Sequence, residues 1–131
     1  MHVMQALDHF EQIGTRGFYR PIGVVTFEQA VEMVAAAIEQ ACELALVDLL
    51  VSVHGLSGFA VPTTFGRYAF AVRWAEASRG TVRIAFVARP ELIDHEKIGM
   101  VMAQNRGLDS EVFSLEADAI RWLDKRLGAR K

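Results

Sequence analysis

Two almost entirely apolar segments, separated by a helical pattern, limit the folds open to this chain. Leu44–Val51 contains one carboxylate, Asp48, and Thr81–Ala88 contains one cation, Arg83. Strands that are apolar on both sides are typical of the centre of a parallel sheet, where helices cover both faces. We therefore expect these two segments to be central strands with parallel neighbours.

Helical patterns alternate with these strands. Thr26 has Gln29 three residues later, which is the spacing of a capping box, and apolar residues then recur on one helical face. Pro62 is suited to begin a second helix, because its missing N–H is no loss there. Gly107 is suited to the left-handed end of a third helix, and a short strand and a final helix follow.

The segment before the first helix has the pattern of two strands. His9–Ile13 and Phe18–Val25 flank a turn at 14–17, and Pro21 and Gly23 interrupt the second strand, which favours an edge position or a bulge. The whole order is ββαβαβαβα. We expect one α/β domain over residues 1–131, with a mixed sheet of about five strands and four helices.

Composition excludes several classes of protein. The chain has 131 residues, 52% of them hydrophobic, a net charge of −2 and a pI near 6.1, so we expect no nucleic-acid partner. Cys42 is the only cysteine, which excludes an internal disulfide. The sequence contains no apolar run of about 18 residues, so we expect no integral membrane segment and a cytoplasmic location.

Five stretches of the sequence resemble the STAS domains, the fold of anti-sigma-factor antagonists, and are most similar to uncharacterised bacterial STAS-like proteins. They are LLVSVHGLSGF, FGRYAFAVRWA, RIAFVARPELID, AQNRG and VFSLEADAIRWL. The antagonists have a phosphorylatable serine after the central strand, usually in an Asp-Ser-Ser-Gly context. Here Ser57 is the nearest equivalent, without the preceding Asp. The resemblance implies a regulatory domain without enzymatic activity.

The turn after the first central strand is the candidate switch or partner loop. It contains Ser52, His54, Ser57 and Gly58. Ser52 and His54 lack the geometry of a catalytic triad, and the turn has no nucleophile elbow, so we expect no catalytic residue. The histidines have no metal-ligand spacing, and the glycines form no phosphate or dinucleotide loop, so we expect no metal and no cofactor.

Three further residues are expected to have structural roles. Asp48 must be paired because it lies in an apolar strand, and we expect backbone N–H groups near the strand end to bind it. Arg89 is expected to pair with nearby acids, although an anion site at the sheet edge is an alternative. Gly107 is expected to end its helix.

The second helix has aromatic residues on two faces. Phe65 and Tyr68 lie on one face, and Phe70 and Trp74 lie on roughly the opposite face. The second apolar face needs a neighbouring helix, a second copy of the chain, or a ligand. A homodimer would use Phe70 and Trp74, whereas a ligand pocket would use Phe59, Phe65, Tyr68 and Trp74.

Two functions therefore stay open from the sequence. The first is a non-enzymatic regulatory or protein-interaction module of STAS-like type, a homodimer with a possible regulatory protein partner. The alternative is a domain that binds a small apolar ligand or a lipid. An apolar molecule that co-purifies with the protein would favour the ligand-binding domain over the regulatory module.

Overall fold

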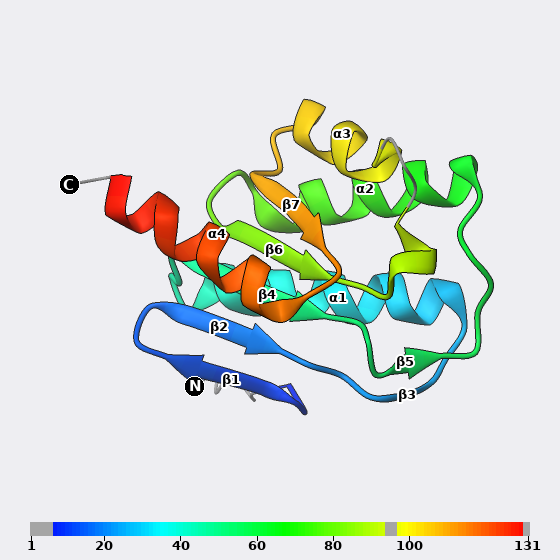
Figure 1. The fold of residues 1–131 in the computed structure, drawn as a ribbon, viewed down its shortest axis with the longest axis horizontal. Coiled ribbons are helices and arrows are strands. Elements are labelled where there is room, and N and C mark those ends of the chain that lie inside the picture. Colours follow the sequence, from blue (N-terminus) through cyan, green and yellow to red (C-terminus); the bar gives the residue numbers. More distant parts are fainter. Residues whose placement is uncertain (1–6, 94–96, 130–131) are drawn as a thin grey trace, which may run out of the picture.

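The computed structural model of this chain describes residues 7–93 and 97–129. Its main feature is a five-stranded sheet with the order β1-β2-β4-β6-β7 (Figure 1). β1 is antiparallel to β2, and the other neighbours are parallel. The predicted α/β class, mixed sheet and element order are therefore confirmed. The bounds are Phe10–Ile13 (β1), Arg16–Tyr19 (β2), Asp48–Ser52 (β4), Arg83–Val87 (β6) and Ser110–Phe113 (β7).

Helices cover both faces of this sheet. α1, α2 and α3 lie on one face and α4 lies on the other, as Figure 1 shows. A short 3-10 helix, η1, follows β6. The bounds are Phe27–Glu43 (α1), Thr64–Ser78 (α2), Pro90–Leu92 (η1), Ile98–Asn105 (α3) and Glu116–Ala129 (α4).

The two central strands are buried along their whole length. Side chains alternate between the faces of a strand, so Leu49 and Val51 of β4 pack beneath α1 and α2, whereas Leu50 packs against α4. β6 follows the same pattern, with Phe86 toward the three helices and Val87 toward α4. The prediction of central, doubly buried strands is confirmed.

Both central strands begin later than predicted. β4 begins at Asp48 rather than Leu44, because Leu44 is the C-cap of α1 and Ala45 has a left-handed backbone with a φ of 56°. β6 begins at Arg83 rather than Thr81, because the Thr81 N–H donates a hydrogen bond within the turn that follows α2. Apolar residues at the end of a helix therefore look like the start of a strand in the sequence.

The predicted strand Phe18–Val25 is two separate elements. β2 ends at Tyr19, and the chain then passes Pro21, which has no N–H to donate to a strand neighbour. β3 (Gly23–Val24) pairs in parallel with β5 (Leu56–Ser57) as a second, two-stranded sheet. This small sheet joins the segment before α1 to the segment before α2.

The helix signals are mostly confirmed. The Thr26 hydroxyl accepts a hydrogen bond from the Gln29 N–H, and the Gln29 side chain accepts one from the Thr26 N–H, which completes the capping box. Gly107 follows α3 with a φ of +93°, as predicted. The predicted start of α2 at Pro62 is two residues early, because the hydroxyl of Thr63 caps this helix.

Candidate functional site

Asp48 has a structural role, but its partner differs from the prediction. Its carboxylate is almost fully buried and accepts two hydrogen bonds from the Arg16 guanidinium, at 2.8 and 3.2 Å. Arg16 also binds Asp124 of α4, at 2.7 Å. Burial lowers the pKa of Arg16, but the hydrogen bonds to both carboxylates outweigh burial and raise this pKa overall. Backbone N–H groups were the expected partners, and a guanidinium from β2 takes their place.

The candidate switch loop is only partly exposed. Ser52 is the last residue of β4 and is buried, whereas His54 and Ser57 are exposed. Ser57 lies in β5, and its carbonyl accepts a hydrogen bond from the Val25 N–H at 2.8 Å. Gly58 has a φ of +102°, and a Cβ there would lie 2.7 Å from the Val25 carbonyl oxygen. This segment is therefore held against β3 and is not a free loop.

Arg89 also holds this segment in place. One of its Nη atoms donates to the Leu56 carbonyl at 2.9 Å and to the His54 carbonyl at 3.4 Å. Its Nε contacts Glu91 at 3.1 Å, which is the expected kind of acidic partner. These contacts favour the structural role of Arg89 over an anion site.

Trp74 belongs to the core, so its predicted place in a dimer interface is wrong. Only 9% of this residue is exposed, and its indole N–H donates to the Val31 carbonyl at 2.9 Å. Its ring stacks on Phe86 of β6, at 4.8 Å between centroids, and on Phe70, at 4.5 Å. The predicted contact between Phe70 and Trp74 is thus present, but inside the molecule.

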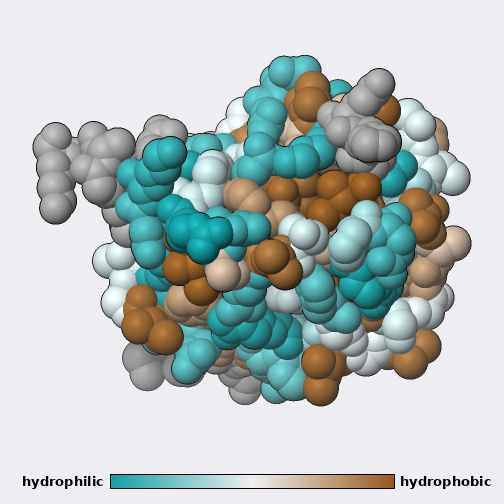
Figure 2. Space-filling model, viewed as in Figure 1, coloured by the Kyte–Doolittle hydropathy of each residue, from teal (hydrophilic) through white to brown (hydrophobic). Residues whose placement is uncertain are grey.

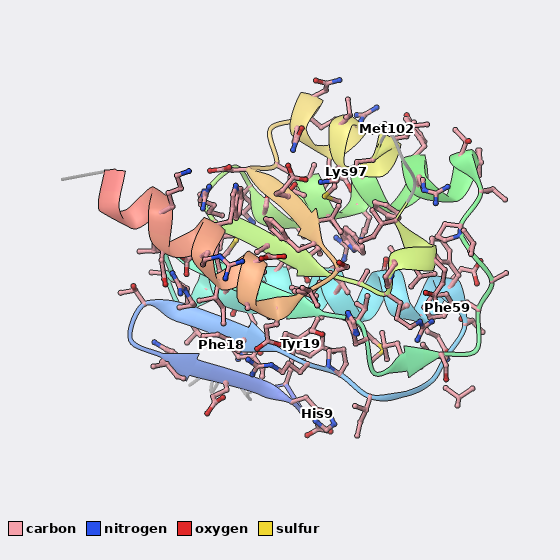
Figure 3. All side chains as sticks on the ribbon, viewed as in Figure 1. His9, Phe18, Tyr19, Phe59, Lys97 and Met102 are labelled. Carbon is pink, nitrogen blue, oxygen red and sulfur yellow. The ribbon has the colours of Figure 1, made fainter. Side chains whose placement is uncertain are left out.

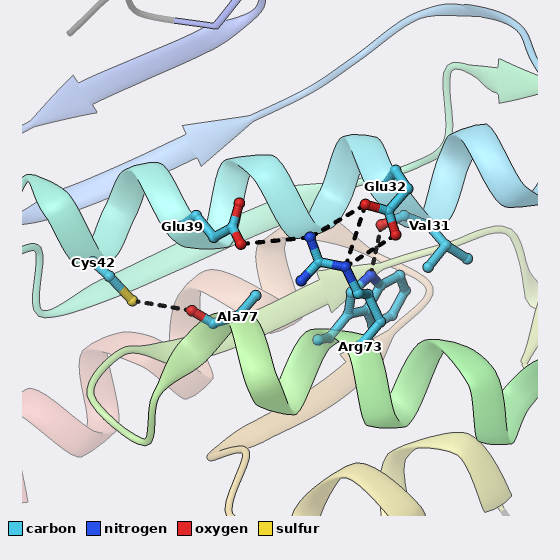
Figure 4. A network of polar contacts seen from close by, with 7 residues as sticks. Val31, Glu32, Glu39, Cys42, Arg73 and Ala77 are labelled. Atoms are coloured by element: carbon cyan, nitrogen blue, oxygen red, sulfur yellow. Dashed lines mark hydrogen bonds and ion pairs between the residues drawn. The ribbon is translucent and has the colours of Figure 1, made fainter.

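The physical reason is that neighbouring helices flank α2 on two sides. α3 packs on one side through Gly99, where a Cβ would lie 2.3 Å from Cζ of Phe70. α1 packs on another side, where Arg73 binds Glu32 at 3.0 Å and Glu39 at 3.5 Å (Figure 4). The neighbouring helix that the sequence left as an alternative therefore accounts for the second apolar face.

Phe65 and Tyr68 do not line the apolar pocket among α1, α2 and α3. Phe65 is 79% exposed and Tyr68 is 45% exposed. The Tyr68 hydroxyl accepts a hydrogen bond from Arg106 at 3.1 Å, and this guanidinium lies 5.1 Å from the centre of the Tyr68 ring. Their face of α2 is exposed, so the predicted grouping of these two residues with Phe59 and Trp74 in one pocket differs from the structure.

A pocket does exist, and Phe59 and Trp74 line it as predicted. It lies among α1, α2, α3 and the end of β6, and its cavity volume is about 110 Å³. Figure 2 shows hydrophobic residues gathered below α3, and Figure 3 shows Phe59 near β5 and Lys97 near α3. The remaining lining residues are Phe27, Ala30, Val31, Val34, Val53, Pro62, Arg67, Phe70, Phe86, Ala88, Leu92, Ile93, Gly99, Met100 and Val112.

The pocket wall is apolar except for two cations, and both have protein partners. One Nη of Arg67 donates to the Pro62 carbonyl at 2.7 Å. The Lys97 ammonium lies 3.5 Å from the Glu111 carboxylate and 3.5 Å from the Val112 carbonyl. These contacts leave the interior of the pocket to hydrocarbon and aromatic surface, which suits an uncharged molecule.

Most of the pocket residues were missed by sequence reasoning. The apolar face of α1 looks the same in the sequence whether it meets a neighbouring helix or a cavity. The sequence prediction named Phe59 and Trp74, which are large aromatic residues of the kind that lines apolar pockets. No comparable signal marks Ala88 or Gly99.

Comparisons with known proteins add nothing to this site. No protein-family model matches the sequence, and no curated protein or solved structure matches it either. The resemblance to STAS domains therefore stays a prediction. Across residues 7–93 and 97–129, no helix is long and apolar enough to cross a membrane, and no cluster of three His, Cys, Asp or Glu side chains could hold a metal ion.

Proposed function

We propose that this chain is a binding domain for a small, uncharged apolar molecule, which occupies the pocket among α1, α2 and α3. The observation that carries the proposal is a cavity of about 110 Å³ with an almost entirely apolar wall. An engineered apolar cavity of about 150 Å³ in another protein binds benzene. The pocket here has a volume of the same order and is partly open to solvent, so a single ring or a short hydrocarbon chain is the ligand size that we propose.

Toluene and methylcyclohexane are suitable probes, because they have the same number of carbon atoms and no charge. We expect either compound to shift the backbone amide signals of pocket residues in an NMR titration. At tenfold excess over the dissociation constant, binding adds about 1.4 kcal/mol to the free energy of unfolding. Native mass spectrometry of gently purified protein tests for a natural ligand in the same pocket.

Ala88→Leu is the variant that tests the location. Ala88 lines the pocket, and three more carbon atoms there fill part of the cavity, so binding of both probes should be lost or strongly weakened. Ala117→Leu is the matched control, because Ala117 is exposed on α4. Wild-type protein that binds neither probe, or Ala88→Leu protein that binds both as well as wild type, would contradict the proposal.

The regulatory module is the second candidate, and the exposed Ser57 side chain favours it. A phosphate on Ser57 would add a charge of about −1.5 to −2 beside β3. Intact-mass measurement of protein from native cells tests this modification, and sedimentation tests the homodimer. A protein that never carries phosphate, in any growth condition, would remove the switch hypothesis.

A further inference from the structure

We infer that the ligand of the pocket is a flat, single-ring aromatic molecule rather than an aliphatic one. This inference rests on the proposed function and names the ligand class of the same site. Five aromatic side chains line the pocket, and they are Phe27, Phe59, Phe70, Trp74 and Phe86. Their geometry, and not only their number, favours an aromatic ligand.

Three of these rings form a nearly parallel stack. Phe70 and Trp74 are inclined by 24° with centroids 4.5 Å apart, and Trp74 and Phe86 are inclined by 18° with centroids 4.8 Å apart. The Trp74 indole N–H is fixed on the Val31 carbonyl at 2.9 Å, so this ring cannot rotate without breaking a buried hydrogen bond. Trp74 is therefore held between two phenyl rings, and all three residues line the pocket.

The two other rings meet differently. Phe27 and Phe59 are inclined by 63° in an edge-to-face pair, with centroids 6.2 Å apart. Aromatic pairs prefer offset-stacked or edge-to-face arrangements, and each such pair contributes beyond its buried area. A flat ring in the pocket meets aromatic side chains and gains from aromatic contact in addition to burial, whereas a saturated ring gains mainly from burial.

Gly99 positions the outer ring of the stack. A Cβ at residue 99 would lie 2.3 Å from Cζ and 2.8 Å from Cε1 of Phe70. Any side chain there must displace the Phe70 ring, which stacks on Trp74. The backbone of α3 therefore approaches closely enough to hold Phe70 in the stack.

The cavity volume favours small ligands. About 110 Å³ is of the same order as the engineered cavity of about 150 Å³ that binds benzene, so single-ring compounds match the pocket in size. The aromatic preference should therefore be largest for single-ring compounds.

The test compares toluene with methylcyclohexane, by NMR titration of the full chain. Each affinity is first corrected for the transfer of that compound from water to hydrocarbon, because the saturated ring is the more hydrophobic. We expect the corrected affinity for toluene to exceed that for methylcyclohexane by about 2- to 12-fold, which is the range for a single aromatic pair.

Phe70→Leu keeps an apolar side chain but removes one ring of the stack. We expect this variant to lose most of the toluene preference while it still binds methylcyclohexane. Phe65→Leu is the matched control, because it is the same substitution on the same helix at an exposed position, and it should keep the wild-type preference. Phe59→Leu supplies the same measurement if Phe70→Leu does not fold.

The outcomes separate this inference from the proposed function. Equal corrected affinities, or a preference that neither Phe70→Leu nor Phe59→Leu changes, would overturn the aromatic ligand and leave the binding domain intact. Binding of neither compound to wild-type protein would overturn both.

Discussion

The face of the sheet under α1, α2 and α3 differs from the face under α4 in how its helices are held. The three-helix face has the larger core, which includes the stacked rings of Trp74 and Phe86, and it contains the pocket. The α4 face has a smaller core and carries charged contacts to the strands. Arg16 binds Asp124, Arg20 binds Glu116, and Arg83 lies over the Trp122 ring.

The two faces therefore differ in role. The three-helix face contains the pocket, and the other face fixes the position of α4 on the sheet. On the three-helix face apolar burial, which has no preferred direction, holds the helices on the sheet, and the ion pairs of Arg73 join α1 to α2 rather than a helix to a strand. Hydrogen-bonded ion pairs require a definite geometry, so they hold α4 in one position along β2. The face that is suited to a ligand is therefore not the face on which ion pairs tie a helix to the strands.

The largest expected effect is the loss of Trp74. Trp74→Ala removes a stacked ring and a buried hydrogen bond, so it should lower the free energy of unfolding by about 3–5 kcal/mol. Trp122→Ala is the same substitution on the α4 face, where the residue is half-buried, and it should cost about 1–3 kcal/mol. Urea denaturation followed by circular dichroism measures both values.

Trp74→Glu tests the same residue against the earlier interface hypothesis. A carboxylate between Phe70 and Phe86 has no hydrogen-bond partner to replace water, so we expect the protein not to fold. A folded, monomeric Trp74→Glu protein would return this residue to a dimer interface. If Trp122→Ala lowered the free energy of unfolding more than Trp74→Ala does, the α4 face would contribute more to stability than the three-helix face.

The second effect concerns the buried anchor of the α4 face. Asp48→Asn leaves the Arg16 guanidinium without its buried carboxylate, and we expect a loss of about 3 kcal/mol in the free energy of unfolding. Asp124→Asn removes the other partner of Arg16, but this side chain is 61% exposed, so the loss should be below about 1 kcal/mol. Similar losses for the two variants would show that burial does not set the strength of this anchor.

The smallest effect is a dependence on pH. The hydrogen bond from Arg20 lowers the pKa of Glu116 from its ordinary value of 4.5. A carboxyl whose pKa is lower in the folded state stabilises the protein above its ordinary pKa, and this stabilisation is lost as the pH falls through the folded pKa. Glu116→Gln should therefore remove less than about 1 kcal/mol near pH 7, because the pair is partly exposed.

Chemical denaturation between pH 7 and pH 3 measures this contribution. The difference in stability between wild type and Glu116→Gln should shrink as the pH falls below about 4.5. In an Arg20→Met background, Glu116→Gln should change the free energy of unfolding less than it does in wild type. The double variant should therefore be little less stable than either single variant. A constant difference over the whole range would mean that the pair adds nothing.

The fold could largely be predicted from the sequence, because its main signals are local. The capping box at Thr26 and the left-handed Gly107 depend on neighbouring residues alone. The two buried strands were recognised because they are apolar on both sides. Their first residues were misplaced, because Leu44 and Ala45 are apolar but end α1.

The site was harder to predict, because it depends on contacts between distant elements. Phe70 and Phe65 lie on the same helix, yet one is stacked in the core and the other is 79% exposed. Phe70 lies on the face that α3 covers, where the backbone of α3 approaches it through Gly99. A sequence pattern shows which residues share a face of a helix, but it does not show which other element of the fold covers that face.

The small sheet of β3 and β5 has a consequence for how this pocket can change over evolution. It supports the pocket rim beside Phe59 through main-chain hydrogen bonds, from the Gly23 N–H to the Gly55 carbonyl and from the Val25 N–H to the Ser57 carbonyl. Such bonds tolerate exchange of most side chains around them, with glycine required where a Cβ would meet the opposite backbone, as at Gly58. Apart from such glycines, side chains of this small sheet can therefore be exchanged while the main chain keeps the shape of the rim.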